Sequence, residues 1–297
     1  MYLSETTVVT AFYNLKSARH PFLSLKVWMQ RLCRLPAAMV IYTSEDLAFD
    51  IYRWRKPYLD RTVVEVRRFD SFGMTCPAMM HFWNGQAAID SEGEDPELYA
   101  TRALRQELVR TTMNRNKFQS RWFVWCDCDI PRFETLLPLY MAFPAEVGRL
   151  CEPARLTLLE VAKIPDSYVV DWVEKKPLAW PVPDITLGSE CMVGDAAAWT
   201  EFGAAYKDAL KEFAYRGWCA GKDQMVLFMM LMEHRTEKPF RLFFAKPLGS
   251  ADFQERYPGT EWLSMPAILG GTVDAVLDTR FEDDDEGRNA LPRPLGL

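Results

Sequence analysis

Two aspartates, Asp127 and Asp129, are the residues whose type and spacing most directly suggest chemistry. They end an apolar and aromatic run that begins at Trp122. Such a run favours a buried strand, and residues two apart on a strand point to the same side. Two neighbouring carboxylates repel each other unless a cation lies between them. At the exposed end of a strand, the pair therefore predicts a site for Mn²⁺ or Mg²⁺, which bind a few carboxylates together with substrate phosphates.

Two other interpretations of this segment are open. The aspartates could be turn or cap carboxylates before a helix that begins at Pro131, since proline suits the first helical position. Cys126 and Cys128 could form a thiolate metal site, but no second cysteine pair or histidine cluster accompanies them. We favour the carboxylate site and expect the two cysteines to be small buried residues.

A third carboxylate, Asp223, stands with Gln224 at the start of a strongly apolar segment that runs to Leu231. A carboxylate at a helix start is either a cap or a catalytic group, and both interpretations are open. Further upstream, Gly188 and Gly194 flank a segment of small residues. Glycine lets a backbone approach a ligand closely, and it also serves ordinary turns.

Several cations could neutralise a diphosphate near these carboxylates. Arg110 and Lys117 are the preferred candidates because they precede the strand that carries Asp127 and Asp129. The other candidates are Arg55, Arg102 and Arg105.

The elements that must position these residues alternate between strand and helix patterns. Such alternation predicts right-handed βαβ units and a single α/β domain with a mostly parallel sheet flanked by helices. Ligands bind beyond the carboxyl ends of such strands, where Asp127, Asp129, residues 10–14 and Ser44 would lie. Residues 77–94 are ambiguous, residues 165–187 read as an irregular loop region, and the chain beyond Pro247 reads as a surface segment. The expected strands are 8–13, 38–43, 62–69, 121–126, 155–162 and 240–245, and the expected helices are 22–35, 45 onward, 97–113, 196–215 and 225–233.

Composition narrows the class of protein. The chain has 297 residues, of which 49% are hydrophobic, which is typical of a well-buried globular protein. A net charge of -6 argues against a nucleic-acid binder. Part of that charge is an acidic run at 282–286, which we interpret as a solvated tail. Neither a secretory signal nor an apolar stretch of about 20 residues is visible. Seven cysteines without a regular spacing favour reduced thiols, so a cytoplasmic protein is expected.

Several segments resemble one family. Residues 7–17, 39–43 and 116–130 are similar to the WlaTC/HtrL (YibB-like) family, and the resemblance covers about residues 6–235. That family commonly has Asp-Ala-Gly where this chain has Asp127-Cys128-Asp129. The difference brings the chain nearer to the Asp-x-Asp motif of GT-A glycosyltransferases. Lys222-Asp223-Gln224 is similar to the Asp-Gln or Asp-Glu element of those enzymes.

The resemblance implies a GT-A-like glycosyltransferase domain at 1–247, with the sugar-donor half at about 1–130, the acceptor half at about 131–247, and an extension at 248–297. It implies transfer of a sugar from a nucleotide sugar, with UDP favoured, to a glycan or other hydroxyl acceptor. Asp129 would bind the metal directly, and Asp127 would face the metal site or the ribose. Asp223 would act beside the sugar, as general base or as stabiliser of an oxocarbenium-like state. The nucleotide would contact Thr10, Ala11, Phe12, Tyr13, Ser44, Asp46, Gln224 and either Arg110 or Lys117.

Two rival functions use the same residues. A metal-dependent nucleotidyltransferase or phosphatase would place the same carboxylates around a phosphate. A non-catalytic module would bind a nucleotide sugar or glycan without turning it over. The identity of the released product separates these functions.

Overall fold

The strands of the chain form one seven-stranded sheet. A computed structural model describes residues 2–15, 20–90, 94–174, 186–233 and 240–281. The strand order is β3-β2-β1-β4-β6-β5-β7, and every neighbouring pair is parallel except those that involve β6. The mostly parallel α/β sheet is therefore confirmed. The strands are β1 (Thr6–Phe12), β2 (Ala38–Thr43), β3 (Thr62–Val66), β4 (Trp122–Cys126), β5 (Leu156–Glu160), β6 (Leu187–Asp195) and β7 (Phe240–Phe244).

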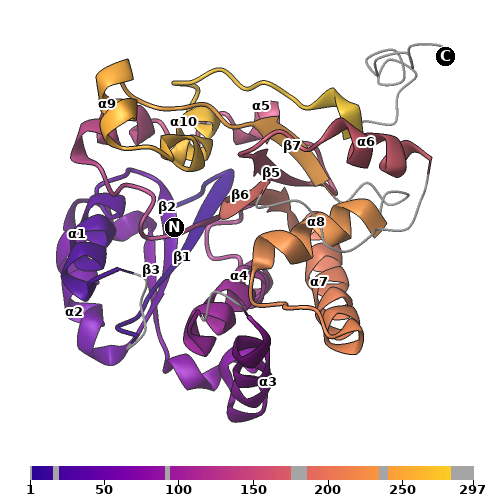
Figure 1. Cartoon of the computed structure of the whole chain (residues 1–297). Helices are drawn as coiled ribbons and strands as arrows, with labels where there is room; N and C mark the ends of the chain where they lie inside the picture. Colours follow the sequence, from indigo (N-terminus) through magenta and orange to yellow (C-terminus); the bar gives the residue numbers. More distant parts are fainter. Residues whose placement is uncertain (1, 16–19, 91–93, 175–185, 234–239, 282–297) are drawn as a thin grey trace.

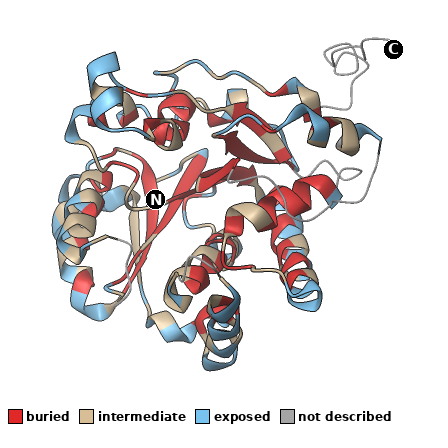
Figure 2. Ribbon diagram, in the orientation of Figure 1, coloured by how far each residue is buried: buried red, intermediate tan, exposed pale blue. Residues whose placement is uncertain are grey.

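Helices cover both faces of the sheet and enclose two cores. In β4, Phe123 and Trp125 belong to one core, whereas Trp122 and Val124 belong to the other, because successive strand residues point to opposite faces. The first core lies under α3 (Pro77–Ile89), α4 (Pro96–Arg115), α7 (Ala196–Arg216) and α8 (Asp223–Glu233). The second lies under α1 (Phe22–Leu32), α2 (Glu45–Trp54) and α10 (Met265–Leu269) (Figures 1 and 2). The shorter helices are α5 (Val147–Leu150), α6 (Asp166–Val173) and α9 (Ala251–Arg256).

A tight turn connects α4 to β4. Asn116 ends α4 in a left-handed conformation with φ of 33°. Its side chain donates to the Ser120 carbonyl at 2.9 Å and accepts from the Ser120 N–H at 2.8 Å. Asparagine tolerates this conformation better than most residues. The turn therefore fixes where β4 begins, and with it the position of the two aspartates that follow.

The small-residue segment at 188–194 is neither a turn nor a loop, because it forms most of β6. Gly194 packs against β5 and α7, where an added Cβ would lie 2.9 Å from Ala198 Cβ and 3.1 Å from Leu156 Cδ1. The glycine thus serves close packing inside a central strand. Two other expectations also change, since residues 77–89 are helical and α6 occupies part of the expected loop at 165–187. Residues 175–185 lie outside the described part of the chain.

The segment beyond Pro247 contributes to the core instead of running over the surface. Met265, Ile268 and Leu269 are fully buried and share a core with Val124 of β4. The acidic run at 282–286 lies outside the described residues. All seven cysteines are free thiols. None of the helices in the described ranges is both long enough and apolar enough to span a membrane.

Candidate active site at the carboxyl edge of the sheet

Asp127 lies directly beyond β4, at the edge where the parallel strands β1, β2 and β4 end. Its Oδ1 accepts a hydrogen bond from Trp125 Nε1 at 2.6 Å. Its backbone N–H donates to the Glu190 carbonyl on β6 at 2.8 Å. The carboxylate is therefore held by its own strand and by the antiparallel neighbour, on a rigid part of the fold.

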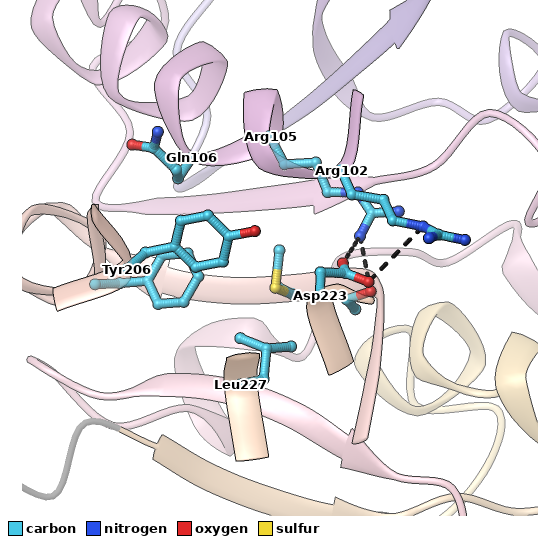
Figure 3. Close-up of a pocket in the computed structure, with 9 residues that line it drawn as sticks. Arg102, Arg105, Gln106, Tyr206, Asp223 and Leu227 are labelled. Atoms are coloured by element: carbon cyan, nitrogen blue, oxygen red, sulfur yellow. Dashed lines mark hydrogen bonds and ion pairs between the residues drawn. The ribbon is translucent and has the colours of Figure 1, made fainter. Parts of the chain in front are cut away.

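Arg105 joins Asp127 to Asp223. Its Nη2 lies 2.6 Å from Asp127 Oδ2, and its Nη1 lies 2.6 Å from Asp223 Oδ2. Nη1 also donates to Ser189 Oγ at 2.7 Å. The guanidinium is buried, and buried charges persist in proteins when they are paired and hydrogen-bonded. This arginine joins the end of β4, the start of β6 and the start of α8. Figure 3 shows its ion pair with Asp223.

Arg102, one turn earlier on α4, fixes the chain that leads into α8. It donates to both oxygens of Glu94, at 2.6 and 3.1 Å, and to the Gly221 carbonyl at 3.0 Å. Its Nε lies 3.8 Å from Asp223 Oδ1. Gly221 packs on Tyr99, whose ring would lie within 2.6 Å of any Cβ at that position. The approach to Asp223 is thus fixed by a salt bridge and a close contact.

Asp129 has a different environment. Its Oδ2 lies 3.0 Å from Arg132 Nη2, and its backbone carbonyl accepts from Arg132 Nε at 3.2 Å. Its Oδ1 is buried and accepts no hydrogen bond from the described residues. The Oδ1 of Asp223 is likewise buried without a hydrogen-bond donor in the part of the chain that the structure describes. An ionised carboxylate oxygen buried in this way is costly unless a ligand occupies it.

Burial and neighbouring charges shift the pKa values of the carboxyl groups in this cluster. Burial raises the pKa of Asp127 to about 6, although Arg105 acts to lower it. Burial also raises the pKa of Glu190 to about 7, again against Arg105. Asp127, Glu190 and Asp223 thus crowd one buried arginine. Negative charge in excess at a buried edge attracts a cation.

The available oxygen ligands fit a metal ion that is shared with a substrate. Across the described residues, no three His, Cys, Asp or Glu side chains form a metal-binding group. Asp127 has both oxygens engaged by Trp125 and Arg105, whereas Asp129 keeps one free. Mg²⁺ and Mn²⁺ commonly use one or two carboxylates and complete their shell with phosphate oxygens and water. Of the two, Asp129 is therefore the one with an oxygen that could bind a metal ion directly.

The thiol alternative for this site is disfavoured. The hydrogen bond with Cys191, together with burial, raises the pKa of Cys126. Burial raises the pKa of Cys128 as well. A raised pKa keeps both sulfurs as thiols, and thiolates are the metal ligands.

The residues expected around the nucleotide lie at the same edge but differ in how far they are exposed to solvent. Thr10, Phe12 and Tyr13 are buried, and Ala11 is half-buried. Phe12 stacks on Phe22 with ring centroids 5.7 Å apart. The hydroxyls of Thr10 and Tyr13 are buried and make no hydrogen bond within the described ranges. Ser44 and Gln224 are half-buried, whereas Asp46 is exposed.

The structure does not bring Arg110 or Lys117 to the carboxylates. Among the described residues, no ion pair or hydrogen bond joins Arg110 or Lys117 to Asp127, Asp129 or Asp223. Arg110 is about 7.5 Å further along the helix axis than Arg105. Lys117 precedes β4, whose length of about 16 Å separates it from Asp127. The cations at the site are Arg102, Arg105 and Arg132.

Arg55 has a structural role. Its side chain is fully buried and donates to three carbonyls beyond α1, at Cys33, Leu35 and Ala37. A guanidinium held by three carbonyls is not available to a diphosphate.

Several other residues at the site have no distinguishing pattern in the sequence. Trp125, Ser189 and Glu190 contact or face the charged cluster, but each reads as an ordinary strand residue. A small cavity also lies beside Asp223, on the side of α7 (Figure 3). Its lining includes Arg102, Arg105, Gln106, Tyr206, Asp223 and Leu227.

Comparison with known proteins gives a structural likeness at low sequence identity. No protein-family model matches the chain, and no curated protein is significantly similar to it. Among solved structures, the chain is similar to the apo crystal structure of mouse xyloside xylosyltransferase 1. The two share 13% sequence identity with a TM-score of 0.42, over 88% of this chain and 92% of that chain. We draw no functional conclusion from a likeness at this level.

Proposed function

We propose that the chain is a metal-dependent glycosyltransferase, which moves a sugar from a nucleoside-diphosphate sugar to a hydroxyl of a glycan or other acceptor. UDP is the favoured nucleotide. The observation that carries the proposal is the arrangement of Asp127, Asp129 and Asp223 with Arg105 at the carboxyl edge of a mostly parallel sheet. The resemblance of residues 116–130 and 222–224 to glycosyltransferase motifs supports it.

On the nucleotide side, Asp129 would hold Mn²⁺ or Mg²⁺ through its free Oδ1. When bound, the ion would offset the negative charge on the departing diphosphate. Asp127 would keep Arg105 in place and face the ribose. Thr10, Ala11, Tyr13 and Ser44 would line the nucleoside side of the same edge.

Asp223 would act on the sugar and the acceptor. In the transfer, the bond from the anomeric carbon to the diphosphate oxygen breaks, and the acceptor oxygen bonds to that carbon and loses its proton. Asp223 keeps an oxygen without a hydrogen-bond donor among the described residues, so it can accept that proton in an inverting reaction. In a retaining reaction, its charge would stabilise an oxocarbenium-like state. In both cases Arg105 and Arg102 hold the carboxylate in place.

Asp223→Asn tests this role. We expect the variant to bind the nucleotide with Mn²⁺ about as well as the native protein, because the metal side of the site is intact. Transfer should fall by about 100-fold or more, the usual contribution of a positioned acid or base. Binding is measured by calorimetry and transfer by product formation, with Asp208→Asn on the exposed face of α7 as a control. Near-native turnover would remove Asp223 from the mechanism.

The identity of the product distinguishes the rival functions. The chain is incubated with nucleotide sugars, Mn²⁺ and candidate acceptors. Glycosyl transfer releases a nucleoside diphosphate, whereas nucleotidyl transfer releases pyrophosphate. Binding without any turnover across the panel would favour a non-catalytic module.

A further inference from the structure

Arg132 is the cation that pairs with Asp129. It stands three residues beyond Asp129 and contacts both the Asp129 carboxylate and the Asp129 carbonyl. These two contacts use two of the five N–H donors of a guanidinium. The remaining donors are available at the edge of the sheet where the nucleotide is expected.

The backbone under Arg132 is fixed while its side chain stays accessible. Arg31 of α1 donates to the carbonyls of Pro131 and Arg132, which ties this turn to the helix. The Arg132 guanidinium lies 5.9 Å from the centre of the Trp28 ring, also on α1. Its side chain is 26% exposed, compared with 9% for Arg105. Because its backbone is fixed and its guanidinium is partly exposed, the Arg132 side chain can change its hydrogen-bond partner without a change in the fold.

We propose that Arg132 changes partner when the nucleotide binds. In the free protein it neutralises Asp129, and once a divalent cation occupies that carboxylate it donates to the diphosphate instead. The inference rests on the proposed function of the site. Two cations on one carboxylate repel each other, so the arriving metal weakens the hold of Asp129 on Arg132. A guanidinium suits a phosphate group well, because its planar N–H donors match two phosphate oxygens.

Arg105 is not suited to this exchange. It is buried and holds Asp127, Asp223 and Ser189 together. Its departure would leave buried Asp223 and half-buried Asp127 without their closest cation, which is strongly unfavourable. Arg132 holds one carboxylate that the metal itself would satisfy.

Arg132→Gln gives opposite effects on two binding measurements if the exchange occurs. Mn²⁺ alone, measured by electron paramagnetic resonance, should bind about two- to fivefold more tightly, because a competing ion pair is gone. UDP in saturating Mn²⁺, measured by calorimetry, should bind about tenfold more weakly, because a charged phosphate contact is lost. Arg34→Gln, which removes an exposed arginine paired with Glu134 in the same region, should change neither value.

Other outcomes overturn the exchange. If Arg132→Gln weakens both Mn²⁺ and UDP binding, the arginine only supports the local structure. If it changes neither, Arg132 contacts neither ligand. Asp129→Asn separates these results from a failure of the proposed function. If the native protein and Asp129→Asn bind Mn²⁺ equally, or if neither binds it, the proposed metal site itself is refuted.

Discussion

Arg105 organises the candidate site because one buried guanidinium satisfies carboxylates from two distant parts of the chain. Asp127 ends a strand and Asp223 begins a helix, and neither has another cation as close as 2.6 Å among the described residues. Without Arg105, buried Asp223 and half-buried Asp127 would both lose their closest cation. The position of the arginine thus determines whether the two carboxylates can stand together.

Arg105→Met tests this at the residue scale. Removing one partner of a buried ion pair typically costs about 3–5 kcal/mol, because the remaining charge stays uncompensated. We expect the free energy of unfolding to fall by about that amount in urea denaturation. Lys211→Met, which breaks an exposed pair with Asp208, should cost less than about 1 kcal/mol. If the free energy of unfolding falls equally in the two variants, Arg105 has no special role in stability.

The residues of the site could be predicted from sequence only in part. Asp127, Asp129 and Asp223 stand out because their type and place in the hydrophobic pattern are local features. The cations do not, because hydrophobic periodicity does not show which arginine of a long helix reaches the end of a particular strand. Arg110 and Lys117 lie nearer to β4 in sequence, yet Arg105 is the residue that pairs with Asp127.

At the scale of single elements, β6 determines how close the two halves of the sheet can lie. It is the antiparallel strand between β4 and β5, and its carbonyl at Glu190 receives the Asp127 N–H. Gly194 keeps it close to β5 and α7. The spacing of this strand therefore influences the position of Asp127.

Gly194→Ala should destabilise the fold by about 1–3 kcal/mol, because an added methyl group in a packed core forces its neighbours to shift. Gly85→Ala is the matched control, because Gly85 lies in α3 with nothing within 4 Å of an added Cβ. That change should stabilise the helix by about 0.5–1 kcal/mol. Thermal and urea unfolding measure both changes. A neutral Gly194→Ala would mean that β6 tolerates a wider spacing.

A second buried charge cluster attaches the segment after β7 to the end of β5. Arg280 Nη2 lies 2.5 Å from Glu160, and Arg280 Nε lies 2.9 Å from Asp278. Arg280 also donates to the Ile164 carbonyl at 3.0 Å and lies 3.4 Å from Asp166. Burial, together with the hydrogen bond with Asp278, raises the pKa of Glu160 to about 7, although the Ile164 N–H and Arg280 act to lower it.

This raised pKa predicts a pH-dependent contribution to stability. Between the ordinary Glu pKa of about 4.5 and about 7, folded Glu160 holds a proton that the unfolded chain releases. Its contribution is therefore complete below about pH 4.5 and is lost as the pH rises through about 7. Glu160→Gln should reduce the loss of stability between about pH 5 and about pH 8 in urea unfolding. Glu201→Gln on α7 serves as control, and an unchanged pH profile in Glu160→Gln would contradict the assignment.

At the scale of the whole molecule, the sheet and most helices follow from hydrophobic periodicity, which is local. The β2 strand was predicted at its observed bounds, and α4, α7 and α8 within a few residues. Elements that periodicity does not predict include β6 and α10. The β6 strand is buried and rich in small residues, so it shows no alternation, and α10 is a short helix whose burial depends on contacts with distant strands.

The central claim is that Asp129 binds a metal ion together with a nucleoside diphosphate. The most direct measurement is calorimetric titration with UDP, or with whichever nucleoside diphosphate most raises the melting temperature, in Mn²⁺ and in a chelator. We expect binding by the native protein in Mn²⁺, little binding in the chelator, and loss of the Mn²⁺-dependent part in Asp129→Ala. Unchanged affinity of Asp129→Ala for the nucleotide in Mn²⁺ would contradict the account.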